Sequence, residues 1–509
     1  MTTQDVRLVP AALTCWAVTA AGIVWGSLVA SCLAAVATLL TAVVGWRMRR
    51  RSDSATWPAV LAVAAVGVAF AIAVGLRVHD VRGHPVVSHY GATAAVVVMP
   101  SESPRFLRGA RMMFRGTLEA LDDQPSGGRV VVFASAADYR DVTAGRPAAF
   151  RARISEPTRR DLSVAVLMAT GPPRLGTAST VQRAAAAARA QFARAATAVL
   201  PPDQAAMLPA LVLGDTAAVD DRTVAQFRAA GLTHLTAVSG ANVTIVCGAV
   251  LLTAGLVGPR IAVMLATVAL VAFVVVVQPS ASVLRAAVMG AIALFAVIAR
   301  RRRQAIPALS ACVLVLLVVA PELAVDVGFA LSVTATAALV VIAPVWARRL
   351  VGRGWPEPLA GAVSVAAAAQ LVTAPLVAGL SGTVSLVSVV ANLAVAAVIP
   401  PITVIGTAAA TVAVWWPGAA ELMIRFTGPE LWWALHVARW AAAVPGAVVT
   451  VPSGWPGVAS VALAGLAVVL SWPFRWARLV MAAAVVCLVA WSLSGHGANQ
   501  SVGRDTIGA

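Results

Sequence analysis

The sequence has little charge and no lysine. Charged residues make up 12% of its 509 positions and 60% of the residues are hydrophobic, whereas soluble globular domains usually carry ~25% charged residues. The mean hydropathy is +0.87. These values exclude an ordinary soluble enzyme, and the hydrophobicity also excludes a disordered chain. A bilayer is therefore the expected solvent for most of the chain.

Several motifs that carry catalysis are also absent. The five cysteines lie singly inside apolar runs, without a Cys-x-x-Cys pair or a histidine partner, so they predict neither disulfides nor a metal site. Without a Gly-x-x-x-x-Gly-Lys phosphate loop, ATP hydrolysis would have to come from a partner. A membrane-embedded hydrolase would need clustered nucleophiles, bases or metal ligands, and the sequence has no such cluster. We expect a protein that is not an enzyme, with no catalytic residue, cofactor or metal.

Apolar runs near the ~20-residue spanning length predict about thirteen membrane helices. They form two groups, one before residue 79 and one after residue 231, with a long polar interval between them. The predicted spans are 11–29, 31–46, 59–77, 235–257, 260–277, 282–299, 306–320, 327–345, 359–379, 385–399, 402–416, 457–472 and 477–493. The expected fold class is a polytopic α-helical membrane protein.

Arginine clusters predict the orientation of these spans. Fourteen of the 38 basic residues, all of them arginine, lie in short hairpins on one side of the membrane, which the positive-inside rule assigns to the cytoplasm. The clusters are Arg47 with Arg49 to Arg51, Arg260, Arg300 to Arg303, Arg348 with Arg349 and Arg353, and Arg475 with Arg478. The N-terminus is then cytoplasmic, and residues 79–231 and the C-terminus are external. Most of the net charge of +17 is therefore topological.

Within the polar interval, the hydrophobic pattern changes to short β-rich stretches separated by turn residues. Candidate strands are 93–99, 110–118, 129–134, 147–155 and 163–168. Five short strands with these breaks fit a small closed barrel such as an OB-fold. This class often binds oligonucleotides or oligosaccharides, but the stretch has few aromatic residues for stacking. Both a nucleic-acid-binding domain and a simple spacer domain are consistent with the pattern.

Two external helices follow the predicted barrel. The first, at 180–200, places Arg183 and Arg194 on one face and Phe192 on the other. This pattern fits a helix lying on the membrane surface and equally a helix packed against its neighbours. A second helix should begin with Asp221 as its N-cap and run to Gly231.

Polar residues that lie where the membrane should be are the main functional candidates, because they are costly in hydrocarbon. His234, Ser239 and Asn242 stand where the chain re-enters the bilayer, and irregular backbone there would indicate a cavity. Arg285 lies about one turn inside the span at 282–299. Asp326, near the start of the span at 327–345, could form an ion pair with it. The remaining candidates are Gln370 and Asn392. For each residue, the alternative is an interhelical hydrogen bond that only holds the bundle together.

At these residues the sequence resembles the ComEC family of competence DNA-uptake channels. The stretches GLTHLTAVSGANV, PSASVLRAAVM, PELAVDVGFALSVTAT and QLVTAPL, with Asn392 and the prolines that follow it, resemble family motifs in order and spacing. The likeness covers about residues 60 to 475 and includes a small external β domain. The predicted domains are N-terminal transmembrane helices at 1–78, an external OB-like β domain at 79–178, external amphipathic or interfacial helices at 179–231, a polytopic competence-type channel domain at 232–494 and a short external tail at 495–509.

The sequence departs from the family pattern in two places. Asn242 stands where many members carry histidine, which weakens a proton-relay interpretation. Many members also continue into an external metallo-β-lactamase-like domain, but no His-x-His-x-Asp-His cluster occurs among the six histidines here. The resemblance therefore implies a channel without the nuclease.

The resemblance implies a multi-pass channel in the bacterial plasma (inner) membrane that passes single-stranded DNA into the cytoplasm during natural transformation. The seven polar candidates would line the channel or contact DNA. Expected partners are single-stranded DNA and membrane lipid, with a separate DNA receptor, nuclease and ATP-driven motor. The alternative is a transporter for another anionic polymer or a lipid-linked phosphate, since arginine and amide groups bind any phosphate. The energy source and the oligomeric state are not encoded in any recognisable motif.

Overall fold

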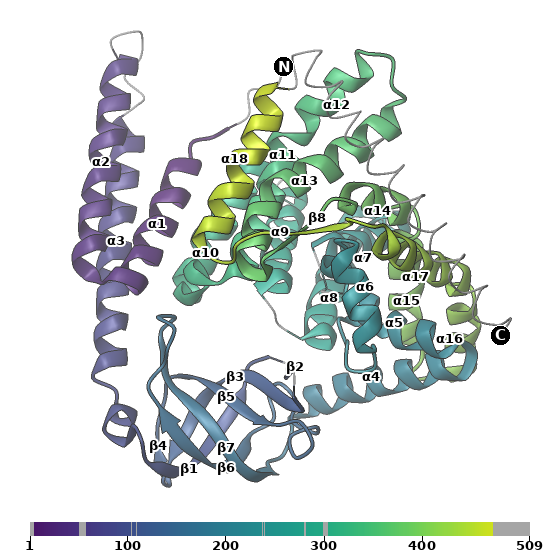
Figure 1. Ribbon diagram of the computed structural model, residues 1–509, viewed down its shortest axis with the longest axis horizontal. Helices are drawn as coiled ribbons and strands as arrows, with labels where there is room; N and C mark the ends of the chain where they lie inside the picture. Colours follow the sequence, from purple (N-terminus) through teal and green to yellow (C-terminus); the bar gives the residue numbers. More distant parts are fainter. Residues whose placement is uncertain are drawn as a thin grey trace, which may run out of the picture. The chain divides into compact units, whose positions relative to one another are not determined.

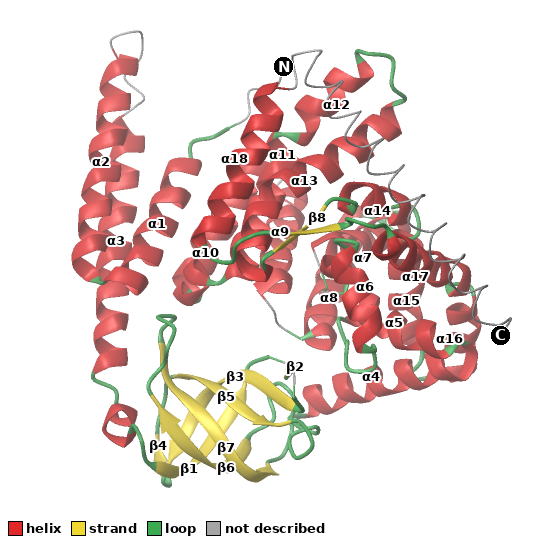
Figure 2. Ribbon diagram, in the orientation of Figure 1, coloured by secondary structure: helices red, strands yellow, loops and turns green. Residues whose placement is uncertain are grey.

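The computed structural model describes residues 5–49, 57–102, 104–107, 109–236, 238, 240–278, 281–298 and 304–471. This part of the chain is mostly helical, and its strands are confined to one barrel and one short ribbon (Figures 1 and 2). The predicted span at 477–493 and the tail at 495–509 lie outside the described residues. By its internal contacts the chain divides into a first unit of Met1–Arg194, Val238–Val333 and Ala410–Pro417 and a second unit of Ala195–Ala237, Thr334–Ala409 and Gly418–Ala509.

The first unit combines apolar helices with the barrel. Its helical elements are α1 (Val9–Trp25), α2 (Ser27–Arg49), α3 (Trp57–Arg82), η2 (Pro85–His89), α7 (Gly240–Ala254), α8 (Pro259–Val277), α9 (Ala281–Ile298), α10 (Ala305–Val319), η4 (Pro321–Val325) and the start of α11 (Val327–Val341). The chain between α1 and α2 turns at Gly26, whose φ of 99° favours glycine. This turn comes earlier than the predicted boundary at residue 30.

Seven strands form the sheet of the first unit. They are β1 (Thr93–Pro100), β2 (Arg105–Leu107), β3 (Arg111–Leu121), β4 (Gln124–Pro125), β5 (Arg129–Ser135), β6 (Ala148–Ser155) and β7 (Ser163–Leu175). The order is β1-β6-β7-β5-β3-β2, and an additional β1–β3 pairing closes five of the strands into a barrel. Only the β5–β7 pair is parallel. All five predicted strands are present, whereas the short β2 and β4 were not predicted.

Alternation of side chains along the strands builds the barrel core. On β3, Met112, Phe114 and Leu118 point inward and are almost completely buried, while Arg111 and Arg115 point outward. This is the period of two expected for a strand with one buried face. Burial of a side chain such as Phe114 contributes about 1.5–3 kcal/mol. The same alternation therefore creates both the core and a basic outer face.

The second unit contains the remaining helices. They are α5 (Pro202–Leu213), α6 (Asp221–Ala229), η3 (Thr233–Leu235), the end of α11, α12 (Ala343–Val351), α13 (Glu357–Ser381), α14 (Ser388–Val395), α15 (Ile399–Val412), α16 (Pro417–Arg425), α17 (Gly428–Ala443) and α18 (Trp455–Ser471). A two-stranded ribbon pairs β8 (Thr383–Ser385) with β9 (Val448–Thr450). The N-cap of α6 is Asp220, whose carboxylate accepts from Thr223 N at 2.6 Å. The prediction of Asp221 as the cap is wrong by one residue.

Several helices have the length and apolarity of membrane spans. Four described stretches qualify on their own: Leu61–His89, Arg260–Val277, Val327–Val351 and Glu357–Ser381. The pair α14 and α15 qualifies together, with a bend of 53° between its halves. The predicted spans 385–399 and 402–416 are therefore one bent pair rather than two spans. Six further apolar helices have 10–17 residues. Each predicted span among the described residues therefore overlaps an apolar helix, and several of these helices are shorter than the ~20 residues of a full span.

Helix α4 (Thr180–Val199) has the predicted extent. Its Phe192 is 0% exposed, so this side chain packs against protein. At the first end of the helix, Val181 is exposed. Arg189 Nη1 donates to Val276 O at 2.8 Å, at the last turn of α8. The sequence left open whether this helix lies on the membrane surface or packs against its neighbours. Phe192 and Arg189 both contact neighbouring protein.

The barrel offers a test of its closure at Gly116. A Cβ at this position would lie 2.6 Å from Val98 Cγ1 and 2.7 Å from Met99 O on β1. Because β1–β3 pairing closes the barrel, we expect Gly116→Ala to destabilise it by about 1–3 kcal/mol. Trypsin digestion of the full chain in detergent should then cut between residues 93 and 175 at a lower temperature. The control is Gly127→Ala, where a Cβ meets nothing within 4 Å; equal protection of both variants would contradict the prediction.

Candidate functional site

The structure separates the polar candidates into two groups. Asn242, Arg285 and Asp326 belong to the first unit. His234, Gln370 and Asn392 belong to the second unit. Ser239 lies outside the described residues.

Arg285 lies in α9 and is 6% exposed. Its Nη2 atom lies 3.5 Å from the position that a Cβ on Gly240 would take, at the first residue of α7. Nη1 lies 3.9 Å from Met289 Sδ, one turn further along α9. Asn242, 5% exposed, stands in the first turn of α7. The structure thus brings Arg285 to the start of the helix that carries Asn242.

This arrangement favours an anion. The first N–H groups of a helix have no intrahelical acceptor, and the helix dipole adds partial positive charge at that end. At the start of α7, the Arg285 guanidinium adds a full charge to the same place. Phosphates and carboxylates bind at such helix ends. Irregular backbone was predicted around Ser239, Gly240 and Asn242, but Gly240 and Asn242 lie in the regular helix α7. The 3₁₀ turn comes earlier, at Thr233–Leu235.

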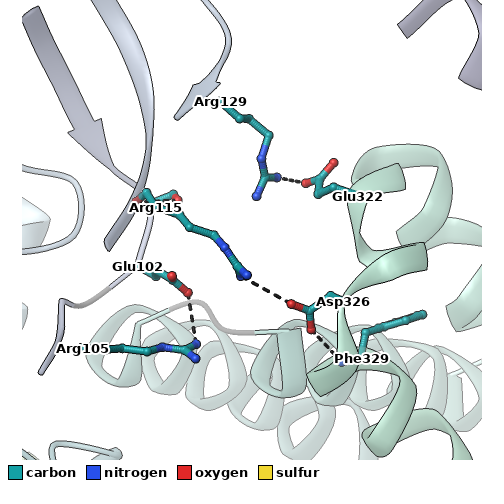
Figure 3. Close-up of polar contacts among 8 residues, drawn as sticks. Glu102, Arg105, Arg115, Arg129, Glu322, Asp326 and Phe329 are labelled. Carbon is teal, nitrogen blue, oxygen red and sulfur yellow. Dashed lines mark hydrogen bonds and ion pairs between the residues drawn. The ribbon is translucent and has the colours of Figure 1, made fainter. Parts of the chain in front are cut away.

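Asp326 has different partners from the one expected. Its Oδ1 accepts from Phe329 N at 2.8 Å, which caps the start of α11, and its Oδ2 accepts from Arg115 Nη1 at 3.4 Å (Figure 3). The predicted pairing with Arg285 is wrong. The cap holds Oδ1 on Phe329 N, and Oδ2 pairs with Arg115 of the barrel.

A second ion pair lies beside the first. Arg129 of β5 donates to Glu322 of η4 (Figure 3). Burial lowers the pKa of Arg129 from its ordinary value, and the nearby Arg115 cation lowers it further. Arg115 pairs across the sheet with Val131, two residues from Arg129. The two arginines are therefore diagonal neighbours on one outer face of the barrel.

Sequence reasoning did not single out Arg115, Arg129 or Glu322. A usable signal was present, because period-two alternation predicts which strand residues point outward. Alternation along a strand does not predict that β3 pairs with β5 or that η4 lies against them, because these contacts are part of the tertiary structure.

In the second unit, Gln370 and Asn392 belong to one hydrogen-bond network. Ser388 Oγ donates to Gln370 Oε1 at 2.9 Å, and Asn392 Nδ2 donates to Ser388 O at 2.8 Å and to Gly231 O at 3.5 Å. Ser385 Oγ donates to the carbonyl of Ala229 at 2.7 Å. The network joins α13, α14 and the turn after α6. The sequence left open whether these amides line a channel or form hydrogen bonds that hold the bundle together. The structure shows hydrogen bonds between elements of the second unit for both Gln370 and Asn392.

The turn before η3 is shaped by this network. Gly231 has a φ of 72°, and a Cβ there would lie 2.4 Å from Ser388 Oγ. Only glycine combines this backbone with so close an approach. His234 follows in η3 with an exposed side chain. The structure therefore places Gln370 and Asn392 together, and His234 three residues beyond the glycine that their network holds.

Comparison with known families agrees with this reading of the motifs. The family model described as Competence protein matches residues 211–476, which is more than half of the 509 residues. The chain belongs to the Competence protein family. The match includes every polar candidate and leaves the barrel and α1 to α3 outside it. No curated protein and no solved structure gave a match.

Family and fold together define the general class. The long apolar helices and the family match make this a membrane protein, and membership indicates a role in DNA uptake during transformation. The resemblance read from the four motifs is thereby confirmed at the level of the family.

The network of the second unit can be tested by a double-mutant cycle. Asn392→Leu removes donors that serve Ser388 and Gly231, and we expect it to lower the free energy of unfolding by about 1–3 kcal/mol because buried acceptors lose their partners. Ser388→Ala should cost a similar amount. Thermal unfolding in detergent of the two single variants and the double variant measures the coupling. Strictly additive losses would mean that the two side chains do not act as one network.

Proposed function

We propose that this chain forms a channel through which single-stranded DNA passes from the outer face of the membrane to the cytoplasm. Membership of the Competence protein family over residues 211–476 carries the proposal. A separate receptor, a nuclease and an ATP-driven motor complete the proposed system. The chain itself takes no catalytic role in this proposal.

The chemistry of the first unit supports a path for phosphates. A strand that crosses an apolar bundle needs groups that replace water around its backbone charges. Arg285 supplies a cation next to the start of α7, and the first turn of α7 supplies backbone N–H donors at the same place. A buried charge is costly in the bilayer, and such residues mark substrate pathways. A path with few strong charges lets the strand bind and still move on.

Three contacts support the proposed orientation. The arginine clusters assign the end of α1, the end of α8 and the loop before α11 to the outer side. Arg160 Nη1 donates to Val24 O at 2.6 Å near the end of α1, and Arg189 Nη1 donates to Val276 O near the end of α8. Arg115 pairs with the start of α11. All three arginines belong to the proposed external segment. Each contacts a helix end that the arginine clusters also assign to the outer side, so the contacts and the clusters support the same topology.

We infer further that the barrel is OB-like. Counted as its five closing strands, the neighbours run 1-2-3-5-4-1, with the third and fifth parallel. In OB-folds the face of the second and third strands binds oligonucleotides, and here these strands are β3 and β5. Arg111 Cζ lies 5.8 Å from the centroid of the Phe133 ring on this face. With Arg115 and Arg129, the face combines a ring and basic side chains, as single-strand grooves do.

The channel is tested by passage of fluorescent single-stranded DNA into proteoliposomes that contain the full chain, scored as protection from added nuclease. We expect Arg285→Ala to reduce the protected fraction by about tenfold or more, because a hydrogen bond to a charged group contributes about 1.5–3 kcal/mol. Arg285→Lys keeps the charge and should give an intermediate value.

The matched control is Arg260→Ala, which removes the same charge from the proposed cytoplasmic hairpin. Unchanged passage in Arg285→Ala would remove this residue from the path. Passage blocked by lipid phosphates and not by excess oligonucleotide would favour the alternative substrate class.

The barrel face is tested separately by equilibrium binding. Phe133→Ala in the full chain should weaken binding of a single-stranded oligonucleotide by about tenfold, since base stacking on an aromatic ring contributes about 1–3 kcal/mol. Arg111→Gln should weaken binding and lower the salt slope by about one. Arg151→Gln on β6, an exposed arginine on another strand, is the control. Equal binding by all of these variants would leave the spacer role for the barrel.

A further inference from the structure

The loop ahead of α11 holds its carboxylates in a defined place. Trp16 Nε1 donates to Ala324 O at 2.8 Å, so α1 fixes the middle of η4. The rings of Trp16 and Phe329 lie edge to face at 5.3 Å, and Phe329 is 0% exposed. Glu322 and Asp326 stand at the two ends of this anchored segment. Their position against the barrel is therefore a property of the packed loop.

Each carboxylate meets one arginine of the β3–β5 face. Arg115 and Arg129 are diagonal neighbours across the strand pair, a relation that separates residues by about 7–8 Å. The side chains of Arg115 and Arg129 are 31% and 39% exposed, whereas those of Asp326 and Glu322 are 19% and 13% exposed. The cations are thus more open to solvent than the anions that hold them. An external anion has access to the arginines while the pairs are intact.

These pairs are also suited to exchange. The arginine side of each pair reaches solvent, and an ion pair that water reaches contributes little net free energy. Phosphate and carboxylate oxygens accept the same bidentate hydrogen bonds from a guanidinium. Replacing one anion by the other keeps the arginine charge satisfied throughout. Glu322 and Asp326 would then be free to face water.

We infer that Glu322 and Asp326 occupy phosphate positions on the β3–β5 face, and that nucleic acid binds there by displacing the two carboxylates from Arg129 and Arg115. The inference rests on the proposed function, because that function supplies the polyanion. The cap on α11 is retained during exchange, since Asp326 binds Arg115 through Oδ2 and Phe329 N through Oδ1. Exchange therefore releases the barrel from the loop ahead of α11 without removing the first hydrogen bond of that helix.

The experiment is binding of a fluorescent oligodeoxythymidine to the full chain in lipid nanodiscs. We expect Glu322→Gln to tighten binding by about two- to fivefold, because Arg129 no longer has a competing anion. Asp326→Asn should also tighten binding, and asparagine keeps the helix cap. The control is Glu119→Gln, an exposed carboxylate on β3 whose loss changes the net charge equally. In the Arg129→Gln background, the gain from Glu322→Gln should vanish.

Binding by Glu322→Gln that is no tighter than binding by Glu119→Gln would overturn the exchange. A gain that persists without Arg129 would overturn it as well, as would the absence of measurable binding in every variant. Passage into proteoliposomes, measured in parallel, separates this inference from the proposed channel. Unchanged affinities with intact passage contradict the exchange alone, and tightened affinities without passage contradict the channel alone.

Discussion

The bilayer's inability to hydrogen-bond the backbone is the constraint on which the rest of this structure depends. Each peptide group at membrane depth has to find its partner inside the protein, so the apolar runs form helices and any break needs a local solution. Two such breaks carry the polar candidates. One precedes α7, where Arg285 meets the helix start, and the other separates α14 from α15, next to the amide network of Asn392. Several of the polar candidates therefore lie beside a helix start or a helix break.

The barrel follows another rule, because its strands satisfy one another and its side chains alternate. That alternation gives an apolar interior around Phe114 and leaves Arg111, Arg115 and Arg129 on the outside. Two of these arginines hold the loop before α11 through carboxylates. The barrel is consequently tied to the start of an apolar helix by two ion pairs.

The two polar groups differ in what they contribute. Around Gln370 and Asn392, hydrogen bonds join α13, α14 and the turn at Gly231, and the close approach of Gly231 to Ser388 leaves no space between them. This is a network that holds a broken helix and a turn together. Around Arg285, the helix start and the guanidinium direct positive charge to one place. The network that holds elements together and the proposed anion site thus lie in different units.

The sequence by itself determined the membrane class, the family, the five main barrel strands and the limits of several helices, such as α8, α10 and α13, because hydropathy, periodicity and motifs are local properties of the chain. It also identified Gln370 and Asn392 as polar residues to explain. Only the tertiary structure decided that Asp326 pairs with Arg115 and not with Arg285, and that the predicted spans 385–399 and 402–416 form one bent pair. Partner choice depends on which elements meet in space, and no local pattern encodes the approach of a loop to a strand 211 residues away in sequence.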